Sequence, residues 1–195
     1  MRRIFHLIIY LLVSGSTFAV EPEVVRRWVF DSPGSAAGWV AVHDMANVRV
    51  EGGRLRLELT GPDAYMTSPV FDVPLDGISV GLRLRGDRPG MTEVFWATRG
   101  APVYDGGRRV VAATPARSAA AAGEDDAVTV EVPIGRPAEA DETLIGIRID
   151  PYNGNTAGAV AITSIEILRL LAVYEASFAP SSCRWIIWPA RRTNW

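Results

Sequence analysis

The sequence is short of the residues from which many catalytic and metal sites are built. It contains one cysteine, Cys183, and therefore forms no intrachain disulfide bond. Of its two histidines, only His43 lies beyond the first twenty residues. One histidine and one cysteine exclude a His/Cys zinc site. A Ser-His-Asp triad would have to use His43, and no nucleophile-elbow motif accompanies it. We expect His43 to be a surface or rim residue.

Long hydrophobic runs are also lacking. A membrane-spanning helix needs about 20 apolar residues, and the longest apolar run here is shorter. The apolar run 4–13, broken only by His6, follows two arginines and precedes small polar residues that end at Ala19. This order is typical of a secretory signal peptide, residues 1–19, with cleavage after Ala19; the alternative is an uncleaved membrane anchor. Cleavage would leave no membrane span. Export without disulfides favours a bacterial periplasm, the cell surface or the extracellular space.

Lysine is absent as well: all 20 basic residues are arginine. Between residues 20 and 170, acidic side chains outnumber the arginines. An acidic domain of this kind is repelled by phosphate, so we expect no nucleic-acid partner.

Strict alternation of aliphatic and polar residues is the strongest pattern present. It places aliphatic side chains on one face of a strand and polar side chains on the other, as in an antiparallel sheet with one buried face. The clearest cases are 54–59, 81–85, 128–132 and 145–150. Further strands are expected at 25–31, 39–43, 47–50, 66–71, 93–98, 108–112 and 159–168, separated by Gly, Asn and Asp turns. The sequence therefore predicts an all-β domain over 20–170, a two-sheet antiparallel jelly-roll β-sandwich.

Two segments depart from the alternation. Residues 112–126 are rich in alanine and charge, which fits a short helix or, as we prefer, a loop. Residues 171–195 are irregular and contain Trp185, Trp188 and Trp195. This tail fits an interaction segment, or the end of a truncated or frame-shifted gene, and no site is assigned to it.

Aromatic side chains suit sugar recognition, because the C–H faces of sugars pack on rings while polar groups at the ring edge bind hydroxyls. The sequence candidates are Tyr65, Trp96, Tyr104 and Tyr152. For Trp96, alternation leaves open whether it or its neighbour Phe95 faces inward. Trp28, Phe30 and Trp39 are expected in the core.

Charged candidates accompany the aromatic ones. Arg83, Arg85 and Arg148 alternate with aliphatic residues and are expected to face outward. If their strands share a sheet, they form either a basic stripe that grips carboxylates or a solvated face.

Carboxylates near strand ends are the other charged candidates: Asp63, Glu93, Asp105 and Asp150. They fit turn-capping residues or a glycosidase pair. No cofactor is expected. The loop 150–155 is rich in Asp and Asn and could contribute calcium ligands, but it lacks EF-hand spacing, and a plain turn also explains it.

A series of short motifs between residues 28 and 168 resembles one known family. In order, they are Trp28-Val29-Phe30-Asp31, Gly38-Trp39, Gly52-Gly53-Arg54-Leu55, 60–65 with Ser68-Pro69, 94–98, 144–151 and 161–167. The chain thereby resembles galactose-binding-like β-sandwich modules, the carbohydrate-binding type attached to bacterial glycosidases. The resemblance implies a non-catalytic module that adds substrate affinity to a partner catalytic domain. Some such modules carry a structural calcium; here Thr163 stands where similar modules often have Asp.

Three functions remain open at this point. The first is a non-catalytic carbohydrate-binding module of an exported bacterial protein. In this hypothesis the module binds a polysaccharide or glycan and is a fragment of a larger glycan-active enzyme. The second is a structural or protein-interaction domain of the cell envelope. The third is a glycosidase or lyase. For the first, the candidate binding residues are Asp63, Tyr65, Arg83, Arg85, Trp96, Tyr104, Arg148 and Tyr152.

Overall fold

The computed structural model describes residues 22–117, 127–135, 139 and 141–169. The predicted signal peptide 1–19, the predicted tail 171–195 and residues 118–126 of the predicted loop lie outside the described residues. None of the described residues belongs to a helix with the length and hydropathy of a membrane span.

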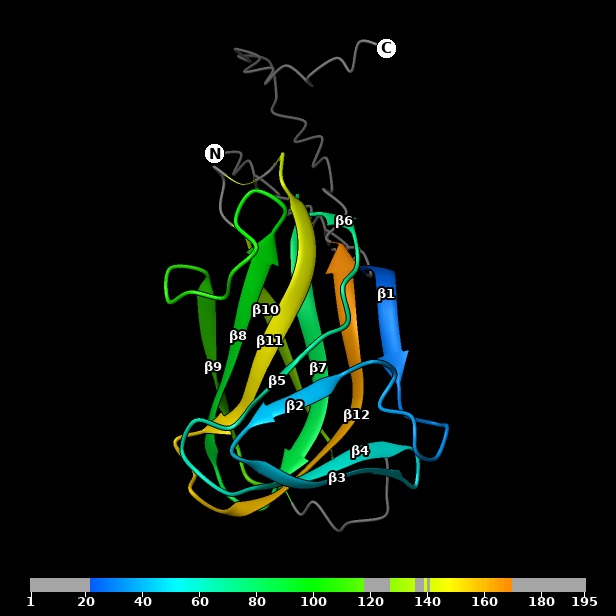
Figure 1. The fold of residues 1–195 in the computed structure, drawn as a ribbon, viewed down its shortest axis with the longest axis vertical. Helices are drawn as coiled ribbons and strands as arrows, with labels where there is room; N and C mark the ends of the chain where they lie inside the picture. Colours follow the sequence, from blue (N-terminus) through cyan, green and yellow to red (C-terminus); the bar gives the residue numbers. More distant parts are fainter. Residues whose placement is uncertain (1–21, 118–126, 136–138, 140, 170–195) are drawn as a thin grey trace, which may run out of the picture.

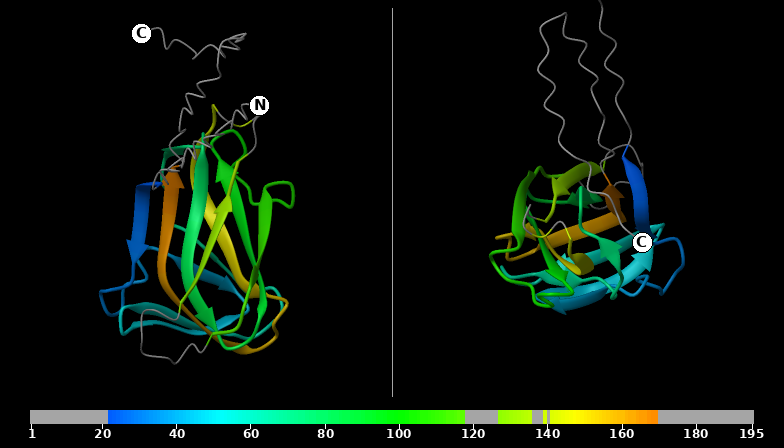
Figure 2. Two further views of the ribbon diagram at one scale, coloured as in Figure 1. Left: turned by 180° about the vertical axis from the view of Figure 1, so that it is seen from behind. Right: turned by 90° about the horizontal axis from the view of Figure 1, so that it is seen from above.

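Two antiparallel sheets form the domain, and they lie face to face as two layers (Figure 1). The first, called the β12 sheet, has the order β10 (Val128–Pro133), β7 (Ile78–Gly86), β12 (Gly158–Arg169), β4 (Arg54–Leu59) and β3 (Met45–Glu51), and β1 (Glu23–Val29) also pairs with β12. The second, called the β11 sheet, has the order β2 (Val40–His43), β5 (Tyr65–Thr67), β11 (Thr143–Asn153), β8 (Gly90–Thr98) and β9 (Arg109–Thr114), and β6 (Val73–Pro74) also pairs with β11. The predicted two-sheet antiparallel jelly-roll sandwich is confirmed, and the view from above in Figure 2 shows the two layers enclosing the interior.

Strands β1 and β4 share one edge of β12 because each covers a different half of it. β4 pairs with residues 158–162 and β1 with residues 164–169. On the β11 sheet, β6 and β5 divide one edge of β11 in the same way. The long strands β11 and β12 are therefore the scaffold on which the short strands are placed.

Most predicted strands are found within a few residues of their expected ends, and β4 matches its expected bounds. The strand expected at 66–71 is wrong in extent, because β5 covers only Tyr65–Thr67. Pro69 follows and has no N–H with which to continue the ladder. The two-residue strand β6 was not predicted from the sequence.

The core lies between the layers and is built from the aliphatic residues of the alternating strands. Leu82 and Leu84 of β7 and Ile147 and Ile149 of β11 are at most 1% exposed. Three aromatic residues predicted for the core are buried there as expected, with Trp28 packed edge-on against Trp39 and Phe71: Trp28, Phe30 and Trp39.

Tyr152 is also buried, in a left-handed backbone conformation with φ of 54°, and its hydroxyl donates to the Pro115 carbonyl at 3.2 Å. Its ring lies against Gly86, where an added Cβ would be 2.5 Å from Cε2 of the ring. Glycine is therefore required at residue 86 to admit the ring.

We expect Tyr152 to make the domain sensitive to alkali. Burial raises the pKa of Tyr152 to about 12. The unfolded chain ionises this group near pH 10, while the folded chain keeps the proton, so stability is lost as the pH rises from 10 towards 12. The full interval corresponds to about 3 kcal/mol. Urea unfolding at pH 9 and pH 11 should show that Tyr152→Phe loses less stability between the two pH values than the native chain does. Equal losses of stability would contradict the role of Tyr152 in the alkaline sensitivity.

Candidate functional site

The outer face of the β11 sheet gathers aromatic and charged side chains from all five strands of its main path. Ile147 and Ile149 of β11 point into the core, so Arg148 and Asp150 point outward. Across the ladder, Arg148 pairs with Phe95 of β8, and Asp150 pairs with Glu93. This outer face is the candidate site.

Five flat side chains, one from each strand, stack side by side across this face, and we call them the stacked row: His43, Tyr65, Arg148, Phe95 and Arg109. The His43 ring stacks on Tyr65 with centroids 5.9 Å apart and planes at 8°. The Arg148 guanidinium carbon lies 3.7 Å from the centroid of the Tyr65 ring and 4.7 Å from that of Phe95. Arg109 closes the row at 5.9 Å from the Phe95 centroid. Contacts between cations and rings at these distances are attractive.

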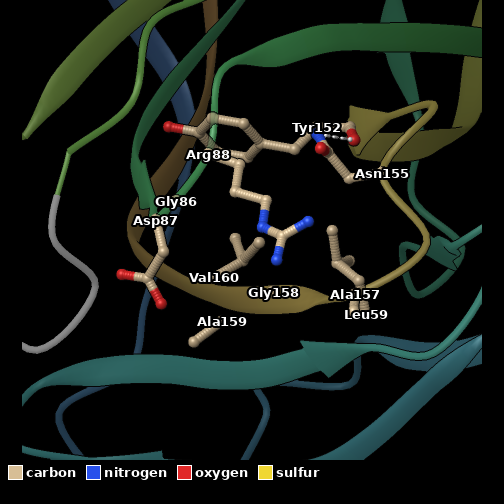
Figure 3. Close-up of a pocket in the computed structure, with 10 residues that line it drawn as sticks. All are labelled: Leu59, Gly86, Asp87, Arg88, Tyr152, Asn155, Ala157, Gly158, Ala159 and Val160. Carbon is tan, nitrogen blue, oxygen red and sulfur yellow. Dashed lines mark hydrogen bonds between the residues drawn. The ribbon is translucent and has the colours of Figure 1, made fainter.

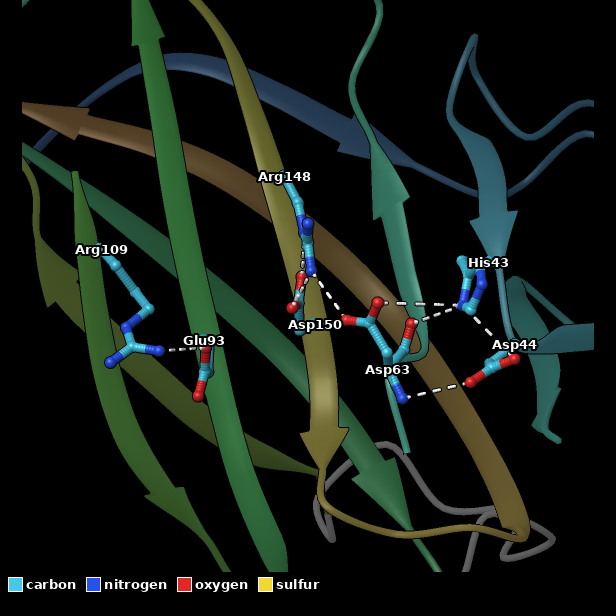
Figure 4. Close-up of polar contacts among 7 residues, drawn as sticks. All are labelled: His43, Asp44, Asp63, Glu93, Arg109, Arg148 and Asp150. Carbon is cyan, nitrogen blue, oxygen red and sulfur yellow. Dashed lines mark hydrogen bonds and ion pairs between the residues drawn. The ribbon is translucent and has the colours of Figure 1, made fainter. Parts of the chain in front are cut away.

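Arg148 is the centre of a polar network on the same face (Figure 4). Its Nε donates to Asp150 Oδ1 at 2.7 Å, and its Nη2 donates to Asp150 Oδ2 at 2.6 Å. Nη2 also donates to Asp63 Oδ1 at 3.1 Å. Asp150 is 1% exposed, so the pair lies largely out of water. The bidentate geometry fixes the guanidinium plane against the two rings.

Burial and pairing shift the pKa values of Arg148 and Asp150 in opposite directions. Burial raises the pKa of the Asp150 carboxyl, and the hydrogen bonds and charge of Arg148 oppose that rise. Burial acts to lower the pKa of Arg148, but the hydrogen bond and charge of Asp150, together with the charge of Asp63, outweigh it and leave the pKa raised. The short bidentate bonds are those of an ionised pair, so we treat both groups as charged at neutral pH.

Asp63 is held in place by the turn between β2 and β3. Asp44 occupies that turn with φ of 45°, and its Oδ2 accepts from the Asp63 N–H at 3.2 Å. An added Cβ at Gly61 would collide with the same oxygen, so glycine there lets Asp44 keep this position. His43 Nδ1 lies 3.3 Å from Asp44 Oδ1 and 3.9 Å from Asp63 Oδ2.

Glu93 and Arg109 extend the network towards the β9 edge. Arg109 Nη1 lies 3.3 Å from Glu93 Oε2, and the Glu93 side chain is 12% exposed. Glu93 and Asp150 are cross-strand partners, and each is paired with an arginine. Both of these carboxylates are therefore engaged by arginines.

Four of the eight candidate binding residues predicted from the sequence lie on this face. Arg148 contacts both Asp63 and Tyr65. Tyr104 reaches the same face farther along β11, where an added Cβ at Gly146 would be 2.6 Å from its hydroxyl. Burial raises the pKa of Tyr104, and a hydrogen bond with Ser68 opposes the rise. The Tyr104 hydroxyl is thus engaged within the protein.

Two aromatic candidates are wrong, because both are buried. Trp96 is 3% exposed and points between the sheets, so its neighbour Phe95 is the outward residue. Its Nε1 donates to Glu139 Oε2 at 3.2 Å, and Arg108 Nε donates to Glu139 Oε1 at 2.7 Å. Tyr152 packs on Gly86, as described above.

Of the two alternatives for the arginines, the basic stripe is ruled out, because their strands do not share a sheet. Arg83 and Arg85 lie on β7 of the β12 sheet, whereas Arg148 lies on β11 of the other sheet. Arg83 is exposed, but Arg85 is fully buried, contrary to expectation. Alternation shows on which side of a strand a side chain lies. It does not show whether other parts of the protein bury that side.

Several residues of the site were not assigned to it from the sequence: His43, Asp44, Phe95 and Arg109. His43 was predicted to be a rim residue, and its side chain is 54% exposed, which confirms that position. The alternation around Phe95 was the one sequence signal for an outward aromatic residue at this point, and it could not decide between Phe95 and Trp96.

Two of the loop residues considered for calcium are hydrogen-bonded within the protein. Both oxygens of Asp150 are bound by Arg148, and the Asn155 amide donates to the carbonyls of Pro89 and Tyr152. Among the residues that the structure describes, no group of three or more His, Cys, Asp or Glu side chains is arranged to hold a metal ion.

A small hollow lies at another part of the molecule, beside Tyr152, Arg88 and Asn155 (Figure 3). Its empty volume is about 150 Å³, including space open to solvent. Pockets that enclose small ligands usually measure about 300–1,000 Å³. The open face of the β11 sheet is therefore the better candidate for a binding site.

Comparison with known proteins finds likeness only among solved structures. No protein-family model and no curated protein matches the sequence. The chain is similar to "BiXyn10A CBM1 APO", with 8% identity and a TM-score of 0.48 over 76% of this chain and 99% of that one. It is similar to CBM29_1, a family 29 carbohydrate-binding module from Piromyces equi, with 12% identity and a TM-score of 0.46 over 73% and 89%. It is also similar to the second N-terminal cellulose-binding domain of β-1,4-glucanase C from Cellulomonas fimi, with 13% identity and a TM-score of 0.47 over 71% and 90%. At these identities and scores, the likeness assigns this chain neither a ligand nor site residues.

Proposed function

We propose that this chain is a non-catalytic glycan-binding module that holds a polysaccharide on the outer face of the β11 sheet. The observation that carries the proposal is the polar network on that face, in which the carboxylates of Asp63, Asp150 and Glu93 are paired with the guanidinium groups of Arg148 and Arg109. Sugar hydroxyls both donate and accept hydrogen bonds, so they match a face that offers acceptors and donors side by side.

The shape of the face supports a chain ligand over a single enclosed sugar. Apolar side chains are exposed on its strands, with Val40 56%, Met91 42% and Val111 39% exposed. Such side chains suit the C–H surfaces of a sugar chain laid across the sheet. The buried or arginine-paired state of Asp150 and Glu93 supports a binding role over a hydrolytic one.

The cellular setting is part of the same proposal. The signal-like segment 1–19 supports export to the periplasm, the cell surface or the medium. Outside the cytoplasm, a module of this kind would hold a polysaccharide close to a catalytic domain. Cell fractionation, followed by gel electrophoresis of each fraction, would locate the protein. Its retention in the cytoplasm would contradict the export proposal.

Affinity gel electrophoresis of the full chain tests glycan binding. We expect retardation in gels that contain at least one soluble neutral polysaccharide from a panel of glucan, xylan and mannan. We expect Asp63→Ala to weaken the binding about tenfold to a hundredfold, because a hydrogen bond to a charged group contributes about 1.5–3 kcal/mol. Unretarded migration of the native chain in every gel would reject the proposal.

Asp72→Ala is the matched control for Asp63→Ala. Asp72 is also an exposed aspartate paired with an arginine: its side chain is 63% exposed and lies 2.8 Å from Arg99, against 59% and 3.1 Å for Asp63 and Arg148. The control variant should migrate like the native chain. Equal weakening in both variants would show that the effect is not specific to the site.

A further inference from the structure

We infer that this face recognises its ligand through hydrogen bonds at the exposed edge of the stacked row, with the Tyr65 hydroxyl as a specificity-determining group, and not by stacking a sugar on an aromatic ring. The inference rests on the proposed function. It assigns the ligand a chemistry: hydroxyl groups directed at the sheet, in place of a flat C–H surface laid on a ring.

A flat group lies beside the Tyr65 ring on each side. β5 lies between β2 and β11 in the sheet, so its two neighbours approach the ring from opposite sides. The Arg148 guanidinium covers one face at 3.7 Å, and the His43 ring stacks from the other side. A sugar could reach either face only by displacing one of these groups, and Arg148 is held by three hydrogen bonds.

Phe95 is unsuited to stacking for the same reason. It lies between Arg148 and Arg109 in the row and is only 8% exposed. Trp96, the next ring along β8, points into the core. Neither ring at the centre of this face therefore offers a flat surface to a sugar.

Hydrogen-bonding groups at the edge of the row remain available. Among the residues that the structure describes, Arg148 donates its side-chain hydrogen bonds from Nε and Nη2 and not from Nη1, and the contacts of Tyr65 are made by its ring and not by its hydroxyl. Asp63 Oδ2 has only the 3.9 Å contact with His43. Together these groups supply a hydroxyl that donates and accepts, a cationic donor and an anionic acceptor. Stacking fixes Tyr65 and Arg148, and hydrogen bonds with Asp44 and Arg148 hold Asp63, so little side-chain freedom is lost when a ligand binds.

Two substitutions at Tyr65 separate hydrogen bonding from stacking. Tyr65→Phe keeps the ring and removes only the hydroxyl, while Tyr65→Trp enlarges the ring and also removes the hydroxyl. We expect both variants to bind the best-retained neutral polysaccharide of the panel about tenfold more weakly than the native chain, the effect of losing one hydrogen bond. A stacking site would instead keep its affinity in Tyr65→Phe and gain affinity in Tyr65→Trp.

Tyr152→Phe is the control, because it removes a tyrosine hydroxyl that is bonded inside the protein. Its affinity should equal that of the native chain, and thermal unfolding would show that each variant is folded at the temperature of the binding assay. Native affinity in Tyr65→Phe, or a gain in Tyr65→Trp, overturns the inference and leaves glycan binding intact. Absence of binding by the native chain to the whole panel rejects the proposed function itself.

Discussion

Replacing Trp96 with alanine is expected to lower the free energy of unfolding by about 3–5 kcal/mol, the usual cost of removing a large buried aromatic side chain. Trp96 is 3% exposed and belongs to the main core cluster between the sheets. The substitution also removes the indole N–H that donates to Glu139, a carboxylate that is 7% exposed. Arg108 remains as a partner of Glu139, so the cavity supplies most of the loss.

Trp96→Phe separates the two contributions. It keeps an aromatic ring in the core and removes the hydrogen bond to Glu139, so it should lose less stability than Trp96→Ala. Urea unfolding curves measure both variants, and the folded Trp96→Phe variant should bind glycan like the native chain. Native stability in Trp96→Ala together with lost binding would return Trp96 to the ligand site.

The fold could be predicted from the sequence wherever one face of a strand is buried. In β4 and β11 the aliphatic residues alternate with polar ones, and both strands lie where that alternation predicts. The two-residue strand β6 is too short to show any period, and it contains Pro74. A short edge strand is defined by its pairing with a strand distant in the sequence, and the local residue pattern does not reveal that pairing.

The candidate site could be predicted only in part, for a related reason. Asp63, Tyr65 and Arg148 were singled out by residue type, and they do lie together. Their joining depends on the pairing of β5 with β11, which alternation does not reveal. The same gap led to the wrong grouping of Arg83 with Arg148, because similar patterns occur on strands of both sheets. Arg109 joins the site solely through the β8–β9 register.

Replacing Arg148 with methionine is the second large effect that we expect. It leaves the Asp150 carboxylate, 1% exposed, without the partner that binds both of its oxygens. Breaking a buried ion pair from one side costs about 3–5 kcal/mol. The Arg148 side chain keeps 19% exposure, so we expect a loss near 3 kcal/mol, at the lower end of that range. Glycan binding should be lost as well, because the stacked row is broken at its centre.

The pH dependence of this variant identifies the cause of the loss. Burial already raises the pKa of Asp150 in the native chain, and without Arg148 nothing opposes that rise. A carboxyl whose pKa is higher in the folded state destabilises the fold as the pH rises above its unfolded value, so Arg148→Met should regain stability as the pH falls from 7 towards 4. Adding Asp150→Asn removes the buried charge, and the double variant should be more stable than Arg148→Met at pH 7.

Arg109→Met is the matched control for Arg148→Met. Arg109 stands at the end of the same row, is 44% exposed and pairs with a single carboxylate, so its loss should cost at most about 1 kcal/mol. Urea unfolding at pH 7 and pH 4.5 distinguishes the cases. Equal losses at the two arginines, or a pH-independent loss in Arg148→Met, would mean that the cost comes from lost packing of the side chain. The stacked row would then owe its stability to contact area, and the Arg148–Asp150 pair would serve only to orient the guanidinium between Tyr65 and Phe95.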